Sequence, residues 1–107
     1  MNSSDNIHQY LEARGWVPKN AASIAKSIAI EAGELLEHFQ WDNPTFEELK
    51  EDPSKLLEVQ RELADVVIYS LQMARYLDIN VDEMIEDKLT VQDKRYPIGT
   101  PQNKEQA

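Results

Sequence analysis

The sequence has no cysteine, only three glycines and no long apolar run. Without cysteine it can form no disulfide framework, thiol nucleophile or cysteine–zinc site. It contains neither G-x-x-x-x-G-K-[ST] nor G-x-G-x-x-G, so a glycine-rich loop is excluded as a phosphate-binding element. No apolar stretch approaches the ~20 residues of a membrane-spanning helix, and the first residues lack an apolar signal core. We therefore expect a cytoplasmic protein with no membrane partner.

Positive charge is also scarce. The chain has 11 Lys and Arg residues and 20 Asp and Glu residues, which gives a formal net charge of −9. Binding to a nucleic-acid polymer needs clustered Lys and Arg, so this class of partner is not expected. A small phosphorylated substrate is still compatible with the charge, because carboxylates attract Mg²⁺ and the ion can bridge to phosphate.

Apolar residues recur at helical spacing along most of the chain, and no strand pattern competes. Thr45 and Glu48 fit a capping box that opens a short helix. Capping residues, glycines and prolines separate the other helical segments. The sequence predicts helices over 5–14, 20–41, 45–51, 55–77 and 81–94, within a single domain, 1–97, and a disordered tail, 98–107.

The long helix over 55–77 is unusual because Leu63, Val67, Leu71 and their neighbours point around most of its circumference. Such a helix must be buried on several sides, and a chain of 107 residues has too few helices to cover it. We therefore predict an all-α, antiparallel helical bundle of about four helices plus a short one. Homo-oligomerisation would complete this bundle, as a homodimer or a homotetramer.

Two pairs of acidic residues interrupt these apolar helices. Glu31 and Glu34 lie three residues apart and share a helix face beside the apolar stripe. Glu62 and Asp65 repeat this arrangement on the long helix. A carboxylate at the edge of a core is costly unless its charge is compensated. One interpretation is a solvated acidic face; the other is that the two pairs face each other and bind a divalent metal ion.

The second interpretation predicts chemistry. Mg²⁺, with Mn²⁺ as the alternative, would polarise a phosphoryl oxygen and lower the pKa of a bound water, and a spare carboxylate could accept the proton of that water. This combination favours hydrolysis of a phosphoanhydride. Neighbouring polar residues extend the same helix faces into a polar lane. They are Ser27 and His38 on the first of these helices, and Glu58, Tyr69 and Gln72 on the second.

Three segments together resemble a known family. E-A-G-E-L-L-E-H-F-Q-W, E-L-A-D-V-V-I-Y and K-R-Y-P are similar to the MazG-like nucleoside triphosphate pyrophosphohydrolases of the all-α NTP pyrophosphatase superfamily. The dCTP pyrophosphatases are near relatives, and the resemblance covers residues 10–97. It implies Mg²⁺-dependent hydrolysis of a (d)NTP to the (d)NMP and pyrophosphate, in housecleaning of the nucleotide pool.

The resemblance also implies roles for individual residues. The two acidic pairs match the catalytic, metal-binding carboxylates of the family, and Trp41 and Trp16 match aromatic residues that line the base pocket. Ile30 stands where many relatives carry a further glutamate, which leaves the general base open. The implied metal ligands are Glu31, Glu34, Glu62 and Asp65, and the implied substrate-binding residues are Trp16, Trp41, Lys88, Gln92, Arg95 and Tyr96.

Two other functions stay open at this point. The chain could act as a dUTPase or a phosphoribosyl-ATP pyrophosphatase, since these relatives share acidic helical sites. Alternatively, it could be a non-enzymatic helical oligomerisation or interaction module in which the acidic pairs hold a structural cation.

Overall fold

A computed structural model describes residues 2–102 of the chain, and these residues form five helices and no strand. The predicted all-α fold is therefore confirmed. None of the helices is long and apolar enough to cross a membrane. Residues 103–107 of the predicted tail lie outside the described part. The helices are α1 (Ser3–Arg14), α2 (Ala21–Glu37), α3 (Phe46–Lys50), α4 (Pro53–Tyr76) and α5 (Val81–Arg95).

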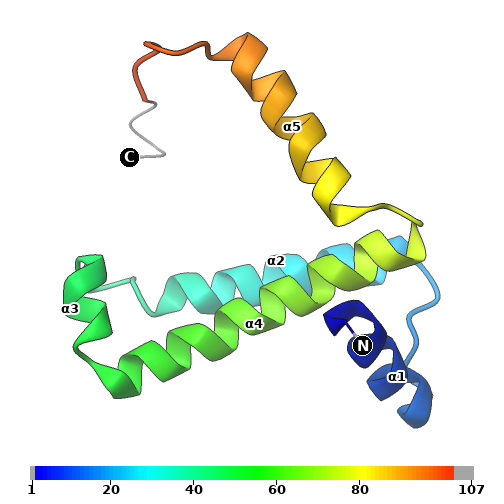
Figure 1. The fold of residues 1–107 in the computed structure, drawn as a ribbon. Helices are drawn as coiled ribbons and strands as arrows, with labels where there is room; N and C mark the ends of the chain where they lie inside the picture. Colours follow the sequence, from blue (N-terminus) through cyan, green and yellow to red (C-terminus); the bar gives the residue numbers. More distant parts are fainter. Residues whose placement is uncertain (1, 103–107) are drawn as a thin grey trace.

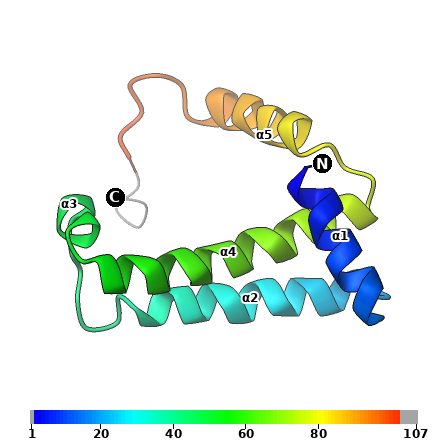
Figure 2. The same cartoon turned by 60° about the horizontal axis from the view of Figure 1, so that its bottom comes forward.

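The centre of the fold is an antiparallel pair made by α2 and α4, which lie side by side along their length (Figures 1 and 2). The short helix α3 lies at the closed end of this pair, where the chain reverses. Helix α1 packs on α4 at the opposite end (Figure 2). The reversal brings the two acidic pairs to the same region, because residues 31 and 34 run against residues 62 and 65.

Side-chain caps explain where the helices begin. Thr45 and Glu48 form the predicted capping box, with Glu48 N donating to Thr45 Oγ1 over 3.2 Å and Thr45 N donating to Glu48 Oε1 over 3.1 Å. Asn80 caps α5 by accepting from the N–H of Glu83. These bonds satisfy N–H groups that have no partner within the helix.

The main boundary error is the end of α2. The sequence predicts a helix as far as Trp41, but the α-helix ends at Glu37. Its last turn tightens: the N–H groups of His38, Phe39 and Gln40 each donate to the carbonyl three residues earlier. Such i→i−3 bonds are typical of fraying helix ends. The prediction was wrong because apolar spacing continues past the point where the backbone leaves the α-helical geometry.

Helix α5 does not join the bundle of its own chain. It extends away from the end of α4, and its packing against the other helices is weaker than that of α1, α2 or α3 on α4 (Figure 1). Its apolar residues Met84, Ile85 and Leu89 are each between 45% and 62% exposed. The bundle formed by residues 2–102 is therefore an open one, with an apolar helix face that no other helix of the chain covers.

The core of the described chain is small. Ile24 and Ala74 are the buried apolar residues, at 3% and 4% exposure, and Gln72 is buried with them. All three lie at the α1 end of the α2–α4 pair. Stability of the single chain therefore depends on few side chains in this region.

We predict that Ile24→Ala lowers the free energy of unfolding by about 2–4 kcal/mol, because it removes buried methyl groups and leaves a void. Ile98→Ala is the matched control, since Ile98 is fully exposed and its replacement changes no buried area. Urea unfolding of both variants measures the difference. Equal midpoints for the two variants would contradict the placement of Ile24 in the core.

Candidate functional site

Three carboxylates meet across the α2–α4 pair. Glu31 comes from α2, and Glu62 and Asp65 come from α4. One carboxylate oxygen of each lies within 4.8 Å of the others, and all three side chains are half-buried. We call these residues the carboxylate cluster. Glu34, on α2, is exposed and lies beside the cluster, close enough to affect the pKa values of Glu31 and Glu62.

Ionisation of the carboxyl groups in this cluster is unfavourable. Burial, followed by the neighbouring Glu34, raises the pKa of Glu31 from 4.5 to about 7, and Asp65 and Glu62 add to this shift. Burial and then Glu34 also raise the pKa of Glu62, whereas His38 lowers it. Desolvation and like charges both disfavour the ionised forms. A cation placed among these oxygens would relieve both effects.

The residues fit a divalent metal ion on independent grounds. Oε2 of Glu31 and Oε2 of Glu62 are buried and have no hydrogen-bond partner among the described residues. Buried polar atoms in folded proteins almost always have partners, so these two oxygens need an explanation. Hard oxygen ligands from several carboxylates are what Mg²⁺ and Mn²⁺ prefer. The unpartnered oxygens and the donor set agree with a site for such an ion.

A second polar contact lies one helical turn from Glu62. Nδ1 of His38, at the end of α2, lies 3.8 Å from Oε2 of Glu58 on α4. His38 and Glu58 each stand four residues from a member of the predicted acidic pairs, Glu34 and Glu62 respectively. The polar lane predicted from the sequence therefore continues toward the α3 end of the helix pair.

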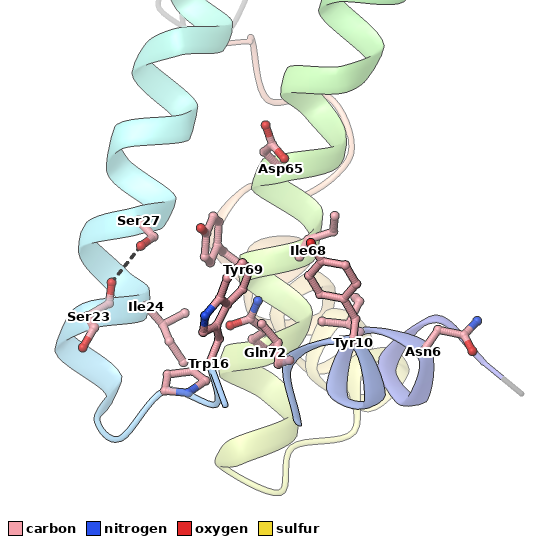
Figure 3. Close-up of a pocket in the computed structure, with 13 residues that line it drawn as sticks. Asn6, Tyr10, Trp16, Ser23, Ile24, Ser27, Asp65, Ile68, Tyr69 and Gln72 are labelled. Atoms are coloured by element: carbon pink, nitrogen blue, oxygen red, sulfur yellow. Dashed lines mark hydrogen bonds between the residues drawn. The ribbon is translucent and has the colours of Figure 1, made fainter. Parts of the chain in front are cut away.

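A cavity of about 650 Å³ adjoins the cluster on its other side, toward α1. This volume lies within the range of small-molecule sites in proteins. Figure 3 shows that α1, α2, α4 and the segment after α1 all contribute to the cavity, with Asp65 at one end of it. The lining residues are Asn6, Ile7, Tyr10, Leu11, Trp16, Pro18, Ser23, Ile24, Ser27, Asp65, Ile68, Tyr69 and Gln72.

The lining combines aromatic rings with a few polar groups. Tyr10 and Trp16 meet edge to face, with ring centroids 6.2 Å apart, and Tyr69 lies on α4 (Figure 3). Gln72 is the buried polar residue of the lining. Flat aromatic surfaces with a small number of amide and hydroxyl groups suit a planar, hydrogen-bonding ligand.

The structure brings together some of the predicted site residues and separates others. The four carboxylates gather at the α2–α4 pair, and Trp16 lines the cavity. Trp41 is 90% exposed and lies outside the cavity lining, because it follows the α3 end of α2, whereas the cavity lies at the α1 end. The four predicted residues of the α5 region, Lys88, Gln92, Arg95 and Tyr96, are also outside the lining.

Gln92 has a feature of its own within the α5 group. Its side chain is half-buried, and its Oε1 has no hydrogen-bond partner among residues 2–102. Arg95 instead lies over the ring of Tyr96, with 5.4 Å from Cζ to the ring centroid.

Sequence reasoning missed the wall that α1 supplies. The spacing of Ile7, Tyr10 and Leu11 predicts the apolar face of a helix, and all three line the cavity. The pattern could not distinguish a face that packs against a core from one that borders an open space. Ser27, Tyr69 and Gln72 of the predicted polar lane do line the cavity.

Comparisons with known proteins agree with this geometry. Residues 26–107 match the MazG-like family, and this range includes all four acidic residues. Among solved structures, the chain is similar to a pyrophosphatase from Archaeoglobus fulgidus, with 35% sequence identity over 87% of each chain and a TM-score of 0.76. No match was found among curated proteins. The family match covers well over half of the sequence, and the chain therefore belongs to the MazG-like family.

Proposed function

We propose that the protein is a nucleotide pyrophosphohydrolase that cleaves a (d)NTP to the (d)NMP and pyrophosphate, with Mg²⁺ or Mn²⁺, in housecleaning of the nucleotide pool. The main support for this proposal is that Asp65 belongs both to the carboxylate cluster and to the cavity lining. A nucleoside in the cavity would direct its phosphates toward the cluster. The MazG-like match and the similarity to a pyrophosphatase support hydrolysis of a phosphoanhydride.

The cavity residues would bind the nucleoside. The rings of Trp16 and Tyr69 offer surfaces for the base, and the Gln72 amide offers both a donor and an acceptor to its edge. Trp41 does not reach this cavity within its own chain. A role for Trp41 at a base therefore requires a second copy of the chain.

The carboxylates would bind the ion and accept the proton of the attacking water. Glu31, Glu62 and Asp65 would hold it, with Glu34 beside them. When bound, the ion supplies charge neutralisation at the phosphates and lowers the pKa of a water molecule. The water oxygen attacks the α-phosphorus, the α–β P–O bond breaks, and pyrophosphate leaves. Glu34 is suited to accept the proton of the water because it is an exposed carboxylate outside the close group of three.

Assembly of two or more copies is the second part of the proposal. The accessible surface of the chain is 8846 Å², whereas a folded monomer of 12.3 kDa has roughly 6,100 Å². The difference exceeds the roughly 800 Å² that a stable interface covers on each partner. The radius of gyration of 16.8 Å likewise exceeds the roughly 13 Å of a compact chain of this length.

Two apolar surfaces are available for this assembly, one on α4 and one on α5. Leu63 and Val67 leave one side of α4 half-exposed, and Met84, Ile85 and Leu89 form a stripe on α5. A second copy would cover both. We infer that α5 carries Lys88, Gln92, Arg95 and Tyr96 to a phosphate-binding role only in such an assembly, as a homodimer or homotetramer.

The proposed reaction can be tested directly. Purified protein with Mg²⁺ should release pyrophosphate and a monophosphate from at least one canonical or damaged (d)NTP. Asp65→Asn should lower kcat by roughly 100-fold or more, because it removes a carboxylate from the cluster. Glu37→Gln, on the exposed side of the same helix pair, should leave kcat unchanged. Failure to hydrolyse any nucleotide would overturn the proposal.

The raised pKa of Glu31 gives a pH prediction for the metal-free protein. Its pKa is about 7 in the folded state and near 4.5 in the unfolded chain, so the folded state binds more protons between these values. The free energy of unfolding therefore falls as the pH rises from about 5 to about 7, and it levels off above that range. Differential scanning fluorimetry with a chelator should show the melting temperature falling through this window.

Glu31→Gln tests the assignment of this effect. The variant should flatten the pH dependence and raise the melting temperature of the metal-free protein above about pH 7, because the amide carries no charge. Mg²⁺ should stabilise the unmodified protein there more than the variant. The control Glu37→Gln should keep the original pH dependence. An unchanged slope in Glu31→Gln would remove Glu31 as its source.

The assembly is tested with a charge on the α5 stripe. Ile85→Asp places a carboxylate on the apolar face, and we expect it to shift the protein toward monomer in sedimentation analysis. Thr90→Asp is the control on the polar face of α5, and it should keep the oligomer. A monomeric unmodified protein would contradict the proposed assembly without affecting the proposed reaction.

A further inference from the structure

Helix α1 stands apart from the family match and yet borders the cavity. The match begins at residue 26, after α1 and Trp16. Ile7, Tyr10 and Leu11 of α1 nevertheless line the cavity, and Figure 3 shows Tyr10 on this wall. The carboxylate cluster, in contrast, lies entirely on α2 and α4. Helix α1 thus supplies a wall to the nucleoside cavity and no residue to the carboxylate cluster, whereas α2 and α4 contribute to both.

Apolar burial contributes little to holding α1 in place. No residue of α1 is buried, and Tyr10 is 52% exposed although it faces the cavity. A helix of 12 residues is marginal by itself and depends on packing for its position. Other contacts must therefore fix the distance between α1 and the opposite wall of the cavity.

Polar contacts with the end of α4 hold α1 in this position. Nη1 of Arg75 donates to Oδ1 of Asp5 over 2.8 Å and to Oγ of Ser4 over 3.2 Å. The hydroxyl of Tyr76 and Nδ1 of His8 share a hydrogen bond of 2.7 Å, and their rings meet edge to face. We call Asp5, His8, Arg75 and Tyr76 the α1 latch.

The latch and the cavity wall occupy adjacent faces of α1. Asp5 and His8 are three residues apart and share one face, which borders the face that carries Ile7, Tyr10 and Leu11. None of the four latch residues lines the cavity. A substitution in the latch therefore acts on a ligand in the cavity only through the position of α1.

We propose that the α1 latch sets the width of the nucleoside cavity, so that Arg75 and Tyr76 are positioning residues for nucleoside binding. This inference rests on the proposed function for its ligand, but the contacts between α1 and α4 are independent of it. Loss of the latch lets α1 move from the cavity and weakens binding of the nucleoside. The cluster on α2 and α4 is untouched, so binding of the phosphates is unchanged.

The kinetic test uses Arg75→Gln with the nucleotide that the activity screen identifies. KM should rise about fivefold, as expected for loss of a partly exposed ion pair, and kcat should stay within about twofold. The Ki of inorganic tripolyphosphate, which has no nucleoside, should not change. Equal rises in KM and Ki, or no rise in KM, would overturn the proposal.

Two further variants separate positioning from a loss of folding. The double exchange Asp5→Arg with Arg75→Asp restores an ion pair of reversed polarity, and it should recover most of the lost affinity. Lys50→Gln breaks an ion pair of 3.1 Å with Glu47 on α3, away from the cavity, and should leave KM unchanged. A double exchange no better than Arg75→Gln alone would argue against the ion pair as the positioning contact.

Hydrogen–deuterium exchange gives a readout that needs no activity. In the nucleotide-free protein, Arg75→Gln should speed exchange of the α1 amides and leave those of the central turns of α2 unchanged. If no nucleotide is hydrolysed but exchange of the α1 amides rises, the proposed reaction is wrong and the positioning of α1 by the latch is supported. Unchanged exchange in α1 would overturn the latch whatever the enzyme hydrolyses.

Discussion

Repulsion among carboxylates at the α2–α4 pair is the interaction on which the rest of the structure depends. Glu31, Glu62 and Asp65 approach within 4.8 Å, with two oxygens buried and unpartnered. The antiparallel pairing of the helices imposes this approach, so the pairing carries an electrostatic cost. A chain whose buried apolar residues in the described part are Ile24 and Ala74 has little with which to offset that cost. A cation bound among these oxygens would therefore stabilise the folded chain.

The sequence predicts the parts of this arrangement that follow from local rules. Carboxylates three apart on one helix face, the capping box at Thr45 and Glu48, and the cap at Asn80 all depend on neighbours within one turn. The antiparallel pairing of the two acidic helices is also compatible with the sequence, because the connector between them, with its turn and short helix, is long enough for the chain to return. These features account for the fold class and the carboxylate cluster.

Other features depend on contacts that a helical period does not encode. Trp41 follows the α3 end of α2, whereas the cavity lies at the α1 end, and apolar spacing gave no sign of this separation. The cavity exists because α1 docks at the end of α4 and not on the acidic faces. That docking uses Arg75 and Tyr76, which in sequence are ordinary polar and aromatic residues at the end of a helix. Long-range polar pairs of this kind have no local signature.

Helix α5 presents the complementary problem. Its cap and its apolar stripe are local and were predicted, but the surface that buries the stripe is not part of residues 2–102 of the same chain. Its cations and Gln92 accordingly lie away from the acidic cluster. A periodic pattern identifies an apolar face without identifying its partner. The sequence therefore predicted this helix as part of the bundle, whereas the single-chain structure leaves α5 outside it.

The division between α1 and the α2–α4 pair has a consequence for how such a protein acquires selectivity. The groups suited to phosphate chemistry lie on two helices within the family match, and their geometry is set by a repulsive cluster that tolerates little change. The wall formed by Ile7, Tyr10 and Leu11 lies outside that match and is held by a few polar contacts. Substitutions there can alter the shape offered to a base without disturbing the carboxylates. The carboxylate cluster thus leaves the shape of this wall of the cavity undetermined.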